Sequence, residues 1–341
     1  MINFLNGARL WLYVNKLSDL GERKAIQLIS KILSKGNVAV GIGDDCAAIE
    51  FGKDYLLVTT DMISEKTHIP KIMKPWQIGW FTVAVNLSDI SAKGGKPLGL
   101  VLTLGLPKNT SESFLKELMK GADACATQFG TSIVGGDTKE THEIVISGTA
   151  FGTVKKDEFM GRKGAKPGDI IAVTGKLGKA AAGYYALKHN MRNKEILKDL
   201  LEPIPRIKEG MALAKTKIVS SSMDISDGLS SSLYQLQELN DVGFEIDKEK
   251  IPLSPVLLKF EVKKDINIYE YAMHFGGDYE LLLALPLDKF DKAQKSLVKT
   301  GTPLTVIGKV TKEKKINIID GQTKKILQNK GYEHFRKRTF C

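Results

Sequence analysis

The stretch "GRKGAKPGDIIAVTG", residues 161–175, divides the chain into two halves of similar make-up. Its basic, glycine- and proline-bearing first part is typical of a connection, and "IIAVT" after it is an apolar strand. On both sides apolar strands alternate with segments of helical period. We therefore predict an α+β protein of two domains with mixed sheets flanked by helices. The predicted boundaries are an extension over 1–16, a first domain over 17–160 and a second domain over 161–341.

The predicted elements alternate along the whole chain. Pro75 suits a first helical position, and Gly130 suits the residue that follows a helix. Strands are predicted at 55–60, 97–107, 132–137, 144–154, 170–174, 280–285 and 304–310, with one more ending at Asp224. Helices are predicted from Pro75 to Gly94, at 112–130, 178–190, 206–215 and 287–300, and from 228 onward.

The composition is that of a soluble globular protein, with 43% apolar and 26% charged residues. No apolar run is long enough to span a bilayer, so we expect no membrane association. The N-terminus mixes apolar and charged residues too closely for a signal peptide. Three cysteines (Cys46, Cys125 and Cys341) form no CxxC pair, which suits a reducing cytoplasm.

The formal net charge of +11 raises the possibility of nucleic-acid binding. The lysines are scattered, however, in surface runs such as "EVKKDI" and "TKEKKI". No helix-turn-helix, zinc-finger or aromatic-interleaved basic pattern occurs. We expect no nucleic-acid partner, and a surface field that attracts small anions.

Five stretches place aspartates beside small residues at a strand end or on a helix. Each aspartate alone has a structural explanation, as a turn or cap residue or, for Asp89, as a residue on a hydrated helix face, and Asp227 before "GLSSSL" is predicted to be a helix N-cap. Together they suggest the hard oxygen ligands that Mg²⁺ prefers. The stretches are "GIGDDCA" (41–47), "VTTDMI" (58–63), "VNLSDISAKGG" (85–95), "IVGGDT" (133–138) and "MDISDG" (223–228).

Electrostatics limits how such aspartates can be arranged. Two carboxylates about 4 Å apart repel by roughly 4 kcal/mol at an effective dielectric near 20. Either the aspartates lie far apart or divalent cations lie between them, and the sequence leaves both arrangements open. The P-loop pattern is absent, and "TGKLGKAAAG" (174–183) has the wrong spacing for it. A nucleotide would therefore be held through metal-bridged carboxylates.

Eight stretches in a fixed order resemble the thiamine-monophosphate kinase family, within the superfamily typified by aminoimidazole ribonucleotide synthetase. The resemblance runs from about Leu17 to Phe335. It implies a two-domain fold, a homodimer formed through the N-terminal halves, and ATP held between the domains. It also implies Mg-assisted transfer of the γ-phosphoryl group of ATP to thiamine phosphate. The stretches are "GIGDDCA", "TTDM" with His68 seven residues on, "VNLSDISAKGGKP", "VGGDT", "GRKGAKPGD", "MDISDGL", "DYELL" and "GYEHF".

The resemblance also implies a set of site residues. The acceptor is a phosphate oxygen that is already largely ionised near neutral pH, so no catalytic side chain acting as a base is expected. Several Mg²⁺ ions would be held by Asp45, Thr59, Thr60, Asp61, Asp89, Asp137, Asp224 and Asp227. ATP would meet Gly136, Asp137, Arg162, Ser226 and, in place of an aromatic residue, Met119. Thiamine phosphate would meet His68 and Tyr332.

The chain departs from the family pattern at one substrate position. Counting back from Asp278 places Gly277 where a substrate-binding Glu is expected, and Glu280 is not a secure replacement. Two alternatives therefore stay open. One is a sister ATP-dependent enzyme of the same fold, of the hydrogenase-maturation or selenophosphate type, the former using a terminal cysteine such as Cys341. The other is a protein that binds nucleotide or thiamine phosphate without turnover.

Overall fold

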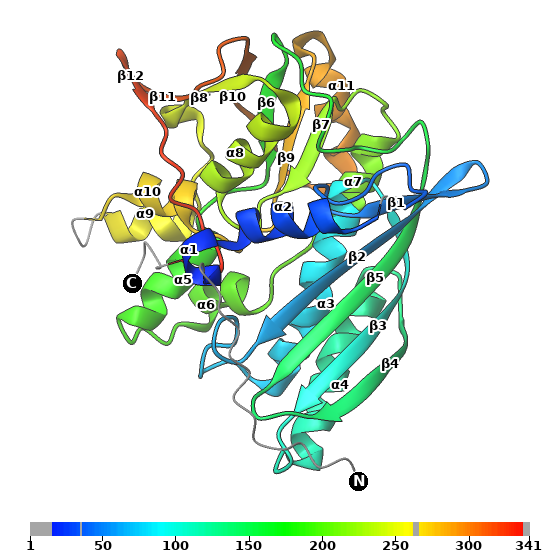
Figure 1. The fold of residues 1–341 in the computed structure, drawn as a ribbon. Coiled ribbons are helices and arrows are strands. Elements are labelled where there is room, and N and C mark those ends of the chain that lie inside the picture. The colour runs from blue at the N-terminus through cyan, green and yellow to red at the C-terminus, as the bar shows by residue number, and fades with distance from the viewer. Residues whose placement is uncertain (1–15, 35, 262–265, 337–341) are drawn as a thin grey trace.

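The computed structural model describes residues 16–34, 36–261 and 266–336 (Figure 1). Cys341 and residues 1–15 of the predicted extension lie outside the described residues. Each half of the chain forms a sheet of its own, so the predicted two-sheet α+β fold is confirmed. The boundary predicted between residues 160 and 161 stays a prediction.

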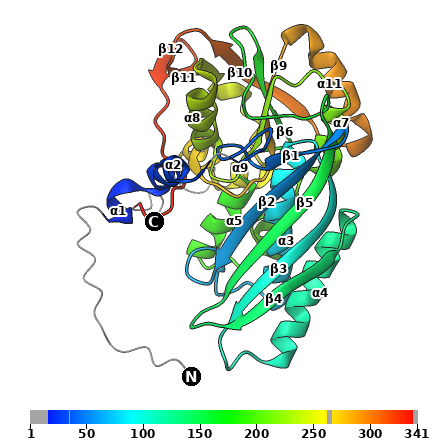
Figure 2. The ribbon, with the colours of Figure 1, turned by 45° about the vertical axis from the view of Figure 1, so that its right-hand side comes forward.

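The first half forms a five-stranded sheet in the order β1-β2-β5-β3-β4. Its strands β3 and β4 run parallel, and the other neighbours are antiparallel. Helices α3 and α4 lie against one face, and no helix of the described residues covers the other face (Figures 1 and 2). The strands are β1 (Ala47–Phe51), β2 (Asp54–Ser64), β3 (Lys96–Leu106), β4 (Ile133–Glu140) and β5 (Val145–Lys155), and the helices are α3 (Pro75–Ala92) and α4 (Glu112–Gln128).

The second half forms a seven-stranded sheet in the order β12-β11-β8-β10-β6-β9-β7. Its strands are β6 (Ile170–Thr174), β7 (Ser221–Asp224), β8 (Gly243–Asp247), β9 (Leu281–Leu285), β10 (Leu304–Thr311), β11 (Ile316–Asp320) and β12 (Thr323–Ile326). Its helices are α5 (Lys179–Lys188), α6 (Lys194–Leu201), α7 (Ile207–Ala214), α8 (Leu229–Asn240), η1 (Lys248–Lys250), α9 (Pro255–Glu261), α10 (Ile268–His274), η2 (Leu287–Lys289), α11 (Phe290–Ser296) and η3 (Val298–Thr300).

Helix α3 belongs to both halves of the molecule. It is apolar or small on nearly every side, and most of its residues are buried. Along its length it bonds to the second half: Gln77 to Glu202, Trp80 Nε1 to the carbonyl of Pro203, and Ser88 to Asp224. Helix α7 crosses it so closely that a Cβ on Gly210 would lie 2.0 Å from the carbonyl oxygen of Ser91. The two sheets are therefore joined through one buried helix.

Most of the predicted elements are confirmed to within a few residues, with two corrections. The helix predicted at 287–300 is broken into η2, α11 and η3. Asp227 is not a helix cap: α8 has Gly228 at its N-cap position and no side-chain cap. Because this loop leaves Asp227 outside the helix, its carboxylate is available for another role.

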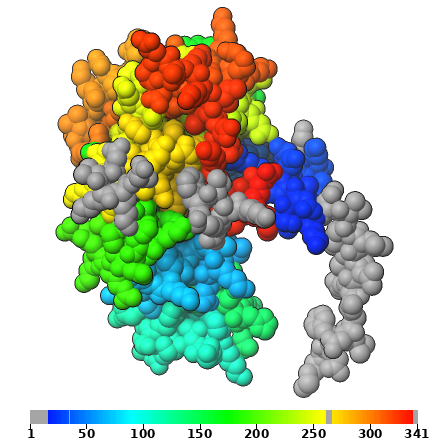
Figure 3. All heavy atoms as spheres, turned by 90° about the vertical axis from the view of Figure 1, so that its left-hand side faces the viewer, coloured from blue at the N-terminus to red at the C-terminus, as the bar shows by residue number. Residues whose placement is uncertain are grey.

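The two ends of the described chain meet on one face. Helices α1 (Leu17–Leu20) and α2 (Glu22–Ile32) lie against residues 329–336, as the blue and red atoms of Figure 3 show. The amide of His334 donates to Glu22, and Arg23 bonds to Ser231. Among the described residues, no helix has both the length and the apolar character that crossing a membrane requires.

Candidate active site

A large cleft of about 1980 Å³ lies between the two halves. Its walls include α2, β2, α3, the loop before α8 and the segment 329–336, so it is built from distant parts of the sequence. Most of the predicted site residues line it: Asp45, Thr59, Thr60, Asp61, His68, Asp89, Arg162, Asp224, Ser226, Asp227, Gly277 and Tyr332.

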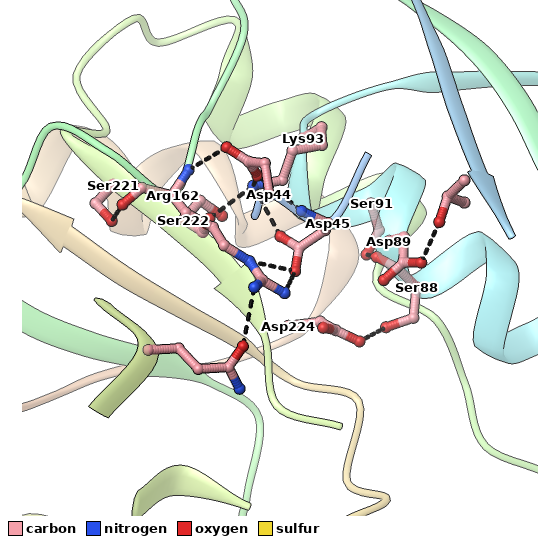
Figure 4. Close-up of polar contacts among 12 residues, drawn as sticks. Asp44, Asp45, Ser88, Asp89, Ser91, Lys93, Arg162, Ser221, Ser222 and Asp224 are labelled. Atoms are coloured by element: carbon pink, nitrogen blue, oxygen red, sulfur yellow. Dashed lines mark hydrogen bonds and ion pairs between the residues drawn. The ribbon is translucent and has the colours of Figure 1, made fainter. Parts of the chain in front are cut away.

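Three aspartates from three elements converge inside this cleft. Asp45 precedes β1, Asp89 is on α3, and Asp224 ends β7. One carboxylate oxygen of each lies within 4.8 Å of the others. Figure 4 shows Asp224 and Asp89 facing Asp45, with Ser88 Oγ donating to Asp224 Oδ2 at 2.6 Å. Carboxylates from both halves of the chain therefore meet at one place.

Burial and mutual repulsion disfavour the charged form of most of these groups. Burial, followed by the charge of Asp45, raises the pKa of Asp61 to about 6 and that of Asp224 to about 7. Burial, followed by Glu22, raises the pKa of Asp227 to about 7. Burial and the neighbouring Asp61 raise the pKa of Asp89 well above its ordinary value. Without added positive charge, the cluster holds protons that a carboxyl in water would have released.

Asp45 differs from its neighbours because it has two cationic partners. Burial opposes its ionisation, but the charges of Arg162 and then Lys93 outweigh burial and lower its pKa. Arg162 Nε donates to Asp45 Oδ1 at 2.7 Å, and Lys93 Nζ lies 2.8 Å from Oδ2 (Figure 4). Asp45 is thus the carboxylate that stays charged in the cluster.

The residues present fit bound Mg²⁺. Asp45 Oδ2 is buried and has no aligned hydrogen bond, although Lys93 lies within ion-pair distance of it. It shares the cluster with Asp89 and Asp224, whose pKa values are raised because burial and neighbouring carboxylates disfavour their charged forms. Hard carboxylate oxygens at this spacing are the donors that Mg²⁺ takes. Asp45, Asp89 and Asp224 could therefore share metal ions, with Asp61 and Asp227 beside them.

Strand alternation separates the predicted ligands of the first sheet into two groups. Thr59 and Asp61 point to the face that α3 covers: Thr59 Oγ1 donates to Asp89 Oδ2 at 2.5 Å, and the Asp61 amide donates to Asn86. Thr60 points to the other face, where its hydroxyl donates to the carbonyl of Gly148. Asp137 pairs with Thr103 on exposed strand β4, and its partners are the Thr138 amide and Lys139. Within one chain, the side chains of Thr60 and Asp137 do not reach the cluster.

The predicted ATP residues are divided in the same way. Arg162 and Ser226 line the cleft, and Arg162 also bonds through Nη1 to Gln235 at 2.9 Å. Gly136 lies in the exposed part of β4, and Met119 is half-buried on α4; neither is among the described residues that line the cleft. Their roles stay predictions.

The predicted substrate residues gather at one end of the cleft. The rings of His68 and His334 are 5.4 Å apart, and the Tyr332 hydroxyl lies 3.2 Å from His334 Nδ1. Gly277 has φ +93°, a backbone conformation that residues with a side chain rarely adopt. A Glu at this position would therefore require a different backbone conformation. Glu280 does not replace it: it is fully buried and bonded to Arg206.

Sequence reasoning missed the polar residues that support the cluster. Lys93, Asp44, Ser88 and Asn86 hold or neighbour the predicted ligands, but their sequence context resembles an ordinary helix and turn. Only Lys93 carried a signal, as a lysine among the small residues of "SAKGG" at the end of a helix that has no other cationic residue.

Comparisons with known proteins agree with this architecture. The family model for AIR synthase related protein, N-terminal domain, matches residues 43–154, and that for the C-terminal domain matches 166–321. A thiamine-monophosphate kinase of Methanospirillum hungatei is 40% identical over 292 residues, covering 85% of this chain and 92% of that protein. That of Aquifex aeolicus is 32% identical over 325 residues, covering 94% and 100%.

Solved structures give the same result. The structure described as "AaThiL complexed with AMPPCP and TMP" superposes with a TM-score of 0.85 at 31% identity, covering 94% of this chain and 99% of that one. E. coli HypE, a hydrogenase maturation protein, has a TM-score of 0.71 at 20% identity, covering 89% and 96%. The second likeness shows a shared fold alone.

Proposed function

Because this chain belongs to the thiamine-monophosphate kinase family, we propose that its cleft transfers the γ-phosphoryl group of ATP to thiamine phosphate, giving thiamine diphosphate. The observation that carries the proposal is the convergence of Asp45, Asp89 and Asp224 from both halves of the chain. A site that must bring two phosphate groups together needs dense charge compensation more than it needs a base, and this cluster can provide it.

The side chains have distinct roles in this mechanism. Asp45, Asp61, Asp89, Asp224 and Asp227 would hold Mg²⁺, and the bound metal would supply positive charge to offset the repulsion between the two phosphate groups. Thr59 fixes Asp89 and Ser88 fixes Asp224, so both carboxylates keep their direction. The acceptor phosphate has a second pKa of about 6, so its oxygen attacks without a protein base.

Arg162 and the aromatic end of the cleft orient the two substrates. Arg162 is held by Asp45 and Gln235 at the border between the halves, where its guanidinium can meet a phosphate of ATP. His68 and Tyr332 lie together with His334, and the ring of Tyr332 offers a face for the cationic ring of thiamine phosphate. The segment 329–336 and α2 wall the cleft here.

We also propose that the chain forms a homodimer through the open face of its first sheet. Ile49 and Met62 are exposed on this face, and Val58 and Phe151 are half-buried beside them. An uncovered sheet face with this composition favours association with another protein surface. Thr60 points to the same face but also lines the cleft, whereas Asp137 lies outside it, so a partner copy is the arrangement in which Asp137 could approach a metal or nucleotide.

The test is direct. The purified protein is incubated with Mg-ATP and thiamine phosphate, and thiamine diphosphate is measured by chromatography against an Asp224→Asn control. Formation of product by the wild type alone supports the kinase. Binding of both ligands without product would favour the non-catalytic alternative. ATP turnover without thiamine diphosphate would favour a sister enzyme of the fold.

A further inference from the structure

Lys93 is a fully buried lysine at the point where α3 meets both halves of the molecule. It follows the last residue of α3 as the C-cap, and its side chain has no exposed surface. Its Nζ lies 2.6 Å from Asp44 Oδ1 and 2.8 Å from Asp45 Oδ2, and it donates to the carbonyl of Ser222 at 2.8 Å (Figure 4). An ammonium group has three N–H donors, and three acceptors surround this one.

The contacts of Lys93 join two segments that must keep register for the cluster to exist. Asp44 and Asp45 form the turn before β1 in the first half, whereas Ser222 is on β7, two residues before Asp224. The ammonium therefore fixes the turn that carries one cluster aspartate against the strand that carries another. A buried ammonium is tolerated only where such partners surround it.

The turn is held on its other side by Arg162. The amide of Arg162 donates to Asp44 Oδ2 at 2.9 Å, and its guanidinium contacts Asp45 Oδ1. Each oxygen of Asp45 thus has its own cation. The contact from Lys93 to Asp45 Oδ2 is an ion pair without an aligned hydrogen bond, so this oxygen keeps a lone pair for the cluster.

We propose that Lys93 is a positioning residue for Asp45: a fixed internal cation that sets the Asp44–Asp45 turn so that Asp45 faces Asp89 and Asp224 before Mg²⁺ binds. This inference rests on the proposed function only in taking the cluster as the Mg²⁺ site. Lys93 acts through Asp45 and contacts no reacting group. Residues that orient metal ligands in this way typically contribute 10–100-fold to metal affinity.

The experiment compares Lys93→Met with the matched control Lys96→Met. Lys96 is exposed three residues away, so its loss removes the same charge from outside the cluster. Calorimetric titration of the full chain with MgCl₂, alone and with a non-hydrolysable ATP analogue, measures Mg²⁺ affinity without turnover. We expect Lys93→Met to weaken Mg²⁺ binding about tenfold or more. Lys96→Met should match the wild type, and Lys93→Arg should recover part of the loss.

Two results would overturn the proposal. Unchanged Mg²⁺ affinity in Lys93→Met would mean that the lysine only fills space, and tighter binding would mean that it competes with the metal. If the Met variant does not fold, Lys93→Gln, which keeps a donor for the Ser222 carbonyl, is titrated in the same way. In kinase assays the half-saturating Mg²⁺ concentration should rise while kcat at saturating Mg²⁺ largely recovers. If the wild type had no kinase activity, the proposed function would fail, yet the Mg²⁺ titrations would still decide the role of Lys93.

Discussion

Ser88 on α3 donates a 2.6 Å hydrogen bond to Asp224 at the end of β7, across the junction of the two sheets. Ser88 is fully buried and Asp224 is nearly so. The bond shows that the halves meet at the carboxylate cluster itself and not merely around it. The relative position of the two halves is therefore part of the geometry of the site.

Replacing a cluster aspartate by asparagine should abolish most turnover and leave the fold intact. Asp61→Asn and Asp224→Asn keep the side-chain shape but remove a charge that metal binding requires, so we expect kcat to fall on the order of a hundredfold. Steady-state kinetics over a Mg²⁺ series measures this. Asp288→Asn, an exposed aspartate paired with Lys289, is the control and should match the wild type. Near-normal rates for either cluster variant at saturating Mg²⁺ would contradict its ligand role.

The metal-free protein should lose stability as pH rises from about 5.5 to 8. Asp224 and Asp227 have pKa values of about 7 and Asp61 of about 6 when folded, above the value of about 3.9 for an unfolded Asp. In this window the folded state binds more protons than the unfolded state, so stability falls with rising pH until the folded pKa values are passed. Thermal unfolding in chelator at several pH values gives the slope. Asp224→Asn should flatten it, and an equal slope in that variant would contradict the assignment.

Mg²⁺ should raise the melting temperature more at pH 8 than at pH 5.5. At pH 8 the cluster carboxylates are largely ionised and repel each other, whereas at pH 5.5 protons compete with the metal for the same oxygens. A ligand that binds only the folded state stabilises it by RT ln(1 + [L]/Kd), so tighter binding at pH 8 gives a larger shift. Differential scanning fluorimetry with and without MgCl₂ measures the shift, and CaCl₂ and NaCl at equal ionic strength separate site binding from screening. A shift independent of pH would place the metal elsewhere.

Glu280→Gln should destabilise the protein without changing the affinity for thiamine phosphate. Glu280 is fully buried among Arg206, Lys179 and Thr174, so removal of its charge leaves two cations without their shared partner. Breaking a buried pair in this way costs about 3–5 kcal/mol. Urea unfolding measures the loss, and KM for thiamine phosphate is measured on the folded fraction. A large rise in KM with unchanged stability would show that Glu280 replaces the Glu missing at Gly277.

A lysine in the open face of the first sheet should weaken the dimer. Val101 is on β3 beside Thr149 of β5, in the middle of that face, so Val101→Lys would bury a charge at the centre of the interface. Light scattering coupled to size-exclusion chromatography should show monomers at concentrations where the wild type is a dimer. Leu287→Lys, at an exposed position of the second half, should leave the dimer intact. A monomeric wild type would rule out the proposed assembly.

Local sequence patterns predicted most of the strands and helices because period and turn residues are local properties. The assembly of Asp45, Asp89 and Asp224 could only be left open, since it depends on how α3 joins the two sheets. Alternation along β2 in principle separates Thr60 from Thr59 and Asp61. The sequence of β2 alone, however, does not indicate which of its two faces α3 covers.

One interpretation failed and one residue was missed for the same physical reason. Asp227 has the residue type of an N-cap, but Gly228 occupies that position, with φ +96° and the backbone of His274 so near that a Cβ would lie 2.8 Å from it. Lys93 was given no role from the sequence, yet it is fully buried because Asp44 and Asp45 neutralise it. Both outcomes depend on partners distant in sequence, which composition and spacing do not reveal.

The burial of α3 has a consequence for any attempt to dissect the molecule. A fragment ending near residue 160 would leave Trp80, Phe81 and Ser91 without the second-half residues that cover them, and a fragment beginning there would lose the helix on which α7 rests. The two halves that the family models match should therefore not fold independently. We expect the two fragments to be soluble only when they are expressed together.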